Sequence, residues 1–120
     1  MKPIPLSTNP LVSRKVGSTW IFKIRRGTET SPIDLTGCTP RSAFREGSVD
    51  GALILLMDGA SGLSIPNPPD GYTWYKVTPA QSVLFPTGVK VFFDLELTDA
   101  AGDVWQSPTY WFIPDPEVTR

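Results

Sequence analysis

The sequence contains no histidine and only one cysteine, Cys38, in 120 residues. Without histidine there is no imidazole to act as a general base or metal ligand near neutral pH. A single thiol forms neither an intramolecular disulfide nor a Cys/His zinc site. A glycine-rich phosphate loop is also missing. We therefore expect no catalytic residue, no cofactor and no metal site, and the chain is compatible with a reducing cytosol.

Long hydrophobic segments are missing too. The longest apolar run covers residues 52–57, far short of the about 20 residues that a membrane-spanning helix needs. Near the start of the chain, Pro3, Pro5 and Pro10 interrupt the sequence, and no apolar core of a secretory signal follows Lys2. We therefore expect no membrane association and no signal peptide.

Basic residues are few. The chain has 11 Lys and Arg against 12 Asp and Glu, and its pI is about 5.3. A group of cations has, together with Trp20, the composition of a surface for single-stranded nucleic acid: Lys23, Arg25, Arg26, Arg41 and Arg45. So few cations in an acidic chain predict a solvated sheet face instead, and we expect no nucleic-acid partner.

The charge is unevenly distributed along the chain. Residues 1–45 hold eight Lys and Arg against two acids, whereas residues 46–120 hold three against ten. The two halves interleave in a sandwich, which cancels the asymmetry. If the asymmetry survives folding, it favours pairing between copies or with a charged neighbour. A homo-oligomer is therefore one assembly that the sequence allows.

What the chain does have is an alternation of apolar and polar residues, punctuated by 13 prolines and 10 glycines. This pattern is typical of short strands joined by turns. The run at 52–57 is continuously apolar, which predicts a central strand buried on both faces. We expect strands over the segments 18–25, 38–45, 52–57, 63–65, 72–77, 89–98 and 103–113, the last interrupted by Pro108.

A capping box beginning at Thr78 predicts one or two helical turns. Short strands with a single helical turn predict an all-β fold, an immunoglobulin-like antiparallel β-sandwich, with a small barrel as the alternative. The length suits one domain. We expect an extended N-terminal arm (1–17), the sandwich domain (18–116) and a C-terminal tail (117–120).

The N-terminal arm contains three prolines and shows no sustained periodicity. Its apolar residues Ile4, Leu6 and Leu11 still need burial, and Arg14 and Lys15 add a small basic step. Two alternatives stay open. The arm lines an edge of its own sheet, or it lies across a neighbouring subunit.

Two pairs of acidic residues have the spacing of functional sites. Asp94 and Glu96 share one face of a predicted strand, roughly 7 Å apart, which is within the range of glycosidase pairs. No third group tunes these carboxylates, so we expect no catalysis. Asp99 and Asp103 flank a glycine turn, but the ligand progression of a calcium loop is missing and such acids are usual turn formers.

Aromatic residues are concentrated in the second half of the chain: Trp74, Tyr75, Trp105, Tyr110, Trp111 and Phe112. Alternation directs about half of these side chains inward. We expect Tyr75, Trp105 and one of Tyr110 and Trp111 to be exposed. Exposed aromatics serve as anchors of a protein interface or as a platform for sugar rings, and we favour the interface.

Three segments carry motifs in a fixed order. Residues 34–45 read DLTGCTPRSAFR, residues 93–102 read FDLELTDAAG, and residues 116–120 read PEVTR. They resemble the DLTG-x-T-x-R, YDLELTD-x-x-G and terminal PEVTR segments of small β-sandwich proteins encoded in the tail modules of bacteriophages and prophages. Similar N-terminal domains occur in baseplate upper proteins, which attach receptor-binding proteins to the tail.

The resemblance implies a structural or adaptor role in the virion, with no catalytic residue to carry over. We expect a non-enzymatic tail, baseplate or fibre protein, assembled in the host cytoplasm, that docks other virion proteins through its arm, sheet edges and exposed aromatics. A capsid decoration or cement protein and a carbohydrate-binding module are the alternatives. The candidate partner-binding residues are Ile4, Leu6, Leu11, Arg14, Lys15, Tyr75, Trp105, Tyr110 and Trp111.

Overall fold

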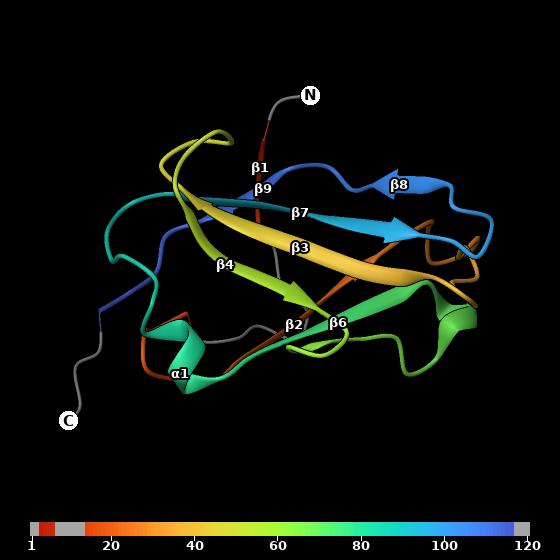
Figure 1. The fold of residues 1–120 in the computed structure, drawn as a ribbon, viewed down its shortest axis with the longest axis horizontal. Helices are drawn as coiled ribbons and strands as arrows, with labels where there is room; N and C mark the ends of the chain where they lie inside the picture. Colours follow the sequence, from red (N-terminus) through yellow and green to blue (C-terminus); the bar gives the residue numbers. More distant parts are fainter. Residues whose placement is uncertain (1–2, 7–13, 117–120) are drawn as a thin grey trace.

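The computed structural model describes residues 3–6 and 14–116, which form a sandwich of two β-sheets (Figure 1). The large sheet has the order β1 (Ile4–Pro5), β9 (Tyr110–Phe112), β7 (Val91–Thr98), β3 (Thr39–Glu46) and β4 (Leu53–Asp58), and β8 (Val104–Gln106) also pairs with β7. The small sheet has the order β2 (Trp20–Arg25), β6 (Tyr72–Val77) and β5 (Leu63–Ser64). Two short helices complete the described part, η1 (Pro68–Asp70) and α1 (Pro79–Ser82).

The predicted β-sandwich is confirmed. Every strand pair among the described residues is antiparallel except β1 with β9, which is parallel. Pro108 separates β8 from β9, as expected for a residue that cannot donate to the ladder. The turn between β7 and β8 has Gly102 at a φ of 90°, a backbone conformation that favours glycine. Thr78 forms the predicted capping box with Gln81 at the start of α1.

The core lies between the sheets and is dominated by aromatic rings. Phe93 of β7 stacks on Phe44 of β3 with ring centroids 4.7 Å apart. Across the sandwich, Phe22 of β2 stacks on Tyr75 of β6 at 4.4 Å. The edge-on contact between Phe22 and Phe93, at 5.7 Å, joins the two pairs. One aromatic cluster therefore holds the sheets together.

Tyr75 is fully buried, so the expectation that it is exposed is wrong. It lies opposite Phe22 in the register of β2 and β6, and that side of β2 faces the core. Its hydroxyl donates to the Ser42 hydroxyl at 2.9 Å, and Ser42 donates in turn to the carbonyl of Asp94 at 2.6 Å. Burial raises the pKa of Tyr75, which keeps the phenol protonated.

The expectation that residues 52–57 form a central strand is also wrong. Among the described residues β4 pairs only with β3, at the end of the large sheet. The chain turns after Asp58 and continues into β5 of the other sheet, so no later described strand joins β4. Leu53 and Leu56 consequently remain 51% and 40% exposed.

Truncating the centre of the core tests this packing. Phe93 is 2% exposed, and we expect Phe93→Ala to lower the free energy of unfolding by about 3–5 kcal/mol, measured by urea denaturation. Val104→Ala is the control, because Val104 is 56% exposed on β8, and it should change stability by less than about 0.5 kcal/mol. Equal effects of the two substitutions would contradict this description of the core.

Candidate docking surface

The first part of the N-terminal arm adds a strand to the large sheet. The Ile4 amide donates to the carbonyl of Thr109 at 2.9 Å, and the Leu6 amide donates to the carbonyl of Trp111 at 2.8 Å. This register places Ile4 beside Tyr110. The structure thus brings Ile4, Tyr110 and Trp111, three of the predicted docking residues, to one edge of the sandwich.

The last part of the arm lies beside the segment that follows β9. The Val16 amide donates to the carbonyl of Asp115, and the Asp115 amide donates to the carbonyl of Arg14, each at 3.0 Å. Lys15 is paired with Asp115 in register, and its carbonyl accepts the indole N–H of Trp20 at 2.8 Å. The described parts of the arm therefore follow the first of the two open alternatives and line their own sheet.

We call this region the β1–β9 edge and define it by Ile4, Arg14, Lys15, Tyr110 and Trp111. Ile4 is 41% exposed, while both aromatic residues are half-buried. The Tyr110 ring packs toward the core, 5.6 Å from the ring of Phe93, and burial raises the pKa of Tyr110. The surface combines apolar, aromatic and basic groups, a composition typical of protein interfaces.

Trp111 lies on the outer face of the large sheet. It is opposite Phe92 in the register of β7 and β9, and the Lys90 ammonium lies 4.4 Å from the centre of its ring. This cation–π contact covers one face of the indole, although the lysine is itself exposed and can be displaced.

The other predicted docking residues do not join this edge. Trp105 lies opposite Leu97 in β8, half-buried, with the Arg26 guanidinium 5.1 Å from its ring. Leu6 packs against the core rather than outward. Leu11 and the tail 117–120 lie outside the described residues.

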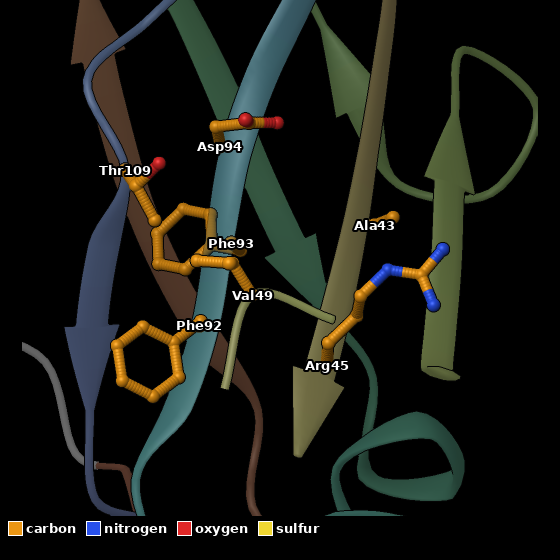
Figure 2. Close-up of a pocket in the computed structure, with 7 residues that line it drawn as sticks. All are labelled: Ala43, Arg45, Val49, Phe92, Phe93, Asp94 and Thr109. Carbon is orange, nitrogen blue, oxygen red and sulfur yellow. The ribbon is translucent and has the colours of Figure 1, made fainter. Parts of the chain in front are cut away.

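A small pocket opens on the outer face of the large sheet, next to the β1–β9 edge (Figure 2). Its volume is about 100 Å³, smaller than the roughly 300–1,000 Å³ of sites for small organic ligands. Such a pocket matches one side chain of a partner better than a free ligand. It is lined by Ala43, Arg45, Val49, Phe92, Phe93, Asp94 and Thr109.

Asp94 supplies the carboxylate of this pocket. It lies opposite Ala43, on the same outward face as Glu96. Partial burial, followed by the negative charge of Glu96, raises the pKa of Asp94. Figure 2 shows Asp94 and Arg45 at separate ends of the pocket, with the aromatic rings on the side toward Thr109. The pocket can therefore accept a hydrogen bond from an inserted side chain at one end.

The remaining acidic residues do not assemble a metal site. Within residues 3–6 and 14–116, no group of three or more Asp, Glu, His or Cys is placed to hold a metal ion. Asp99 instead accepts hydrogen bonds from the amides of Ala101 and Asp103, both at 2.9 Å, so it shapes the turn after β7. No helix in the part of the chain that the structure describes is long and apolar enough to cross a membrane.

The outer face of the small sheet carries a pattern that the sequence alone does not predict. The Lys23 ammonium lies 4.0 Å and the Arg25 guanidinium 4.2 Å from the ring of Tyr72. Lys23 also lies 5.0 Å from the ring of Trp74. Grouping these cations with Trp20 was misplaced, because Trp20 is fully buried. The signal lies in the cross-strand register of β2 and β6, which a single sequence does not reveal.

Comparison with known proteins bears on the architecture. No family model matches the chain, and no curated protein sequence matches it. Among solved structures, the chain is similar to CopC from Methylosinus trichosporium OB3b, with a TM-score of 0.51, 12% sequence identity and coverage of 99% of each chain. At this identity the likeness supports the β-sandwich fold alone.

The raised pKa of Asp94 predicts that its ionised carboxylate lowers the free energy of unfolding in a pH-dependent way. The folded protein holds the Asp94 proton more tightly than the unfolded chain, so the free energy of unfolding falls as pH rises from below the usual carboxyl range through the folded pKa. We expect Asp94→Asn to raise the melting temperature at pH 7, and the gain to shrink as pH falls below 4. The control is Asp50→Asn, which removes an exposed carboxylate. Equal gains from both variants at every pH would contradict this assignment.

Proposed function

We propose that this chain is a non-enzymatic structural protein of a bacteriophage virion, an adaptor of the tail, baseplate or fibre. Its β1–β9 edge docks another virion protein. The observation that carries the docking role is the convergence of Ile4, Tyr110 and Trp111, from both ends of the chain, on one edge beside a pocket that fits a single side chain. The virion assignment comes from the three sequence motifs.

The first motif has a folding role that is compatible with this proposal. The Asp34 carboxylate accepts hydrogen bonds from the Thr36 hydroxyl at 2.7 Å and from the Thr36 amide at 2.9 Å. These bonds lower the pKa of Asp34 and form the turn that leads into β3. A motif that shapes a turn implies a common fold among the proteins that carry it and requires no common chemistry.

A docking role also fits the groups at the surface. Docking requires anchors and a polar rim, and no acid–base pair. At the β1–β9 edge, the ring of Trp111 on the outer face is the aromatic anchor, Ile4 adds exposed apolar area, and Arg14 and Lys15 add positive charge near the rim. A partner would complement this surface with acidic residues around the rim and, for the pocket, a side chain that carries a hydrogen-bond donor for Asp94.

The two alternatives predict different outcomes. A capsid decoration protein would use the same fold on capsid subunits, so the location in the particle separates it from a tail adaptor. A carbohydrate-binding module needs an open aromatic face, whereas cations lie over the rings of Trp105 and Trp111. Quenching of tryptophan fluorescence by a glycan, abolished by Trp111→Ala, would favour the sugar-binding alternative.

The test is incorporation into phage particles. We expect mass spectrometry of purified particles to detect the chain, and immunogold labelling to place it on the tail. Trp111→Ala should reduce incorporation at least about tenfold, as expected for an anchor residue worth more than 1.4 kcal/mol. Trp105→Ala is the matched control, since it removes the same side chain from β8, outside the β1–β9 edge, and should assemble normally.

Purified variants should keep the circular dichroism and the melting transition of a folded protein, so that a loss of incorporation reports on docking. Absence of the chain from the particles would overturn the virion proposal. Normal incorporation of Trp111→Ala would place the docking surface elsewhere.

A further inference from the structure

Strand β4 leaves an apolar edge open. Its sequence is LILLMD, so five consecutive apolar residues precede Asp58. Among the described residues only β3 pairs with it, and the backbone groups on its other side face no strand. An edge of this kind is a template for pairing with another chain. A bulge occurs near its start, but the register is regular from Leu55 to Asp58.

The other strand edges of the described sandwich are protected. β1 is two residues long and contains Pro5. β5 is also two residues long, and β8 has three. β2 is as long as β4, but it carries Lys23 and Arg25 on its exposed face. Short strands, proline and charge are the usual devices that prevent edge-to-edge association. β4 has none of these devices before its last residue.

The sequence of β4 is also typical of a strand with a neighbour on each side. A continuously apolar run predicts burial between two strands and under both faces. In the single chain, Leu53 and Leu56 are instead largely exposed. A partner strand at this edge would supply the missing neighbour on the open side of β4, and its outward side chains would lie beside Leu53 and Leu56.

We propose that the partner is a second copy of this chain, paired antiparallel through β4 about a twofold axis, so that the two large sheets become one. A strand can pair antiparallel with a second copy of itself in a closed, twofold-symmetric contact. Residue i of one copy then meets residue j of the other, and j meets i. The proposal concerns the contact between copies and does not depend on a virion role.

The charges at the two ends of β4 are complementary in this arrangement. Arg45 lies opposite Leu53 at the start of β4, and it donates to the carbonyl of Gly51 at 3.2 Å. Its side chain reaches from β3 toward β4 (Figure 2). Asp58 ends the strand and lies opposite Arg41. Both residues are on the outward face of the large sheet, as is Arg45.

Antiparallel pairing brings the end of one β4 to the start of the other. Asp58 of each copy then lies beside the start of the partner's β4, toward which Arg45 extends from the partner's β3, once at each end of the contact. The apolar residues between them, with Leu56 on the outward face, meet their counterparts in the middle. Opposite charges that flank an apolar segment fix its register and disfavour a parallel pairing, which would place like charges side by side.

The first experiment measures mass by sedimentation equilibrium over a wide range of protein concentration. We expect the wild type to have twice the mass of the chain, and Leu56→Lys to raise the dissociation constant at least about tenfold, because two lysines would then face each other across the axis. The control is Val104→Lys on β8, which adds the same charge at an exposed position and should leave the dimer intact. Circular dichroism confirms that each variant is folded.

A charge exchange tests the orientation. Asp58→Arg alone and Arg45→Asp alone should each weaken the dimer, and the double variant should restore it, since it exchanges the two charges within each pair. Trp111→Ala should not affect the dimer, which separates this contact from the β1–β9 edge. A wild type that is monomeric at every concentration, or a dimer that Leu56→Lys does not weaken, would overturn the proposal.

Discussion

Unpaired backbone groups at the edges of its two sheets set what this sandwich can do. A two-layer sandwich satisfies the backbone of its inner strands, but each outer strand keeps one side with unpaired amides and carbonyls. The large sheet treats its two ends differently. At one end the chain's own arm supplies β1, a short strand that contains Pro5 and bonds in parallel to β9. At the other end β4 remains apolar and open among the described residues. Both proposals follow from this asymmetry, the docking of another protein at the first end and the pairing of two copies at the second.

The aromatic core leaves the open sides of these edges free, because it holds the two sheets together through side chains on their inner faces. Phe93, Phe44 and Phe22 join the two layers at the centre, and the hydroxyl of Tyr75 bonds to Ser42 across the sandwich. A domain stabilised by this cluster can use its periphery for binding. The surface pocket and the raised pKa of Asp94 belong to that periphery, where a partly buried carboxylate lowers the stability of the free protein and a donor from a partner would compensate for it.

Much of the fold could be predicted from local patterns. Alternation in 89–98 located β7, the capping box at Thr78 located α1, and Pro108 explained the break between β8 and β9. The wrong predictions concern features that depend on contacts between segments far apart in the sequence. Alternation leaves two ways to orient β6, and Tyr75 faces the core because its register with Phe22 requires it. An apolar run such as that of β4 predicts a buried strand. It does not indicate whether the neighbouring strand comes from the same chain or from another one. For the candidate site, the sequence predicts Ile4 as an apolar arm residue that needs burial and one of Tyr110 and Trp111 as exposed. Their meeting at one edge depends on a parallel pairing that no local signal encodes.

Pairing of two copies through the open edge of β4 is the proposed contact that a measurement on the backbone itself can reach. Hydrogen–deuterium exchange of the β4 amides, compared in dilute and concentrated solution, tests it most directly because it reports on backbone pairing residue by residue. We expect protection over Leu53–Asp58 to increase with protein concentration, while protection of β9 stays constant. Exchange of the β4 amides at one rate across all concentrations would contradict it.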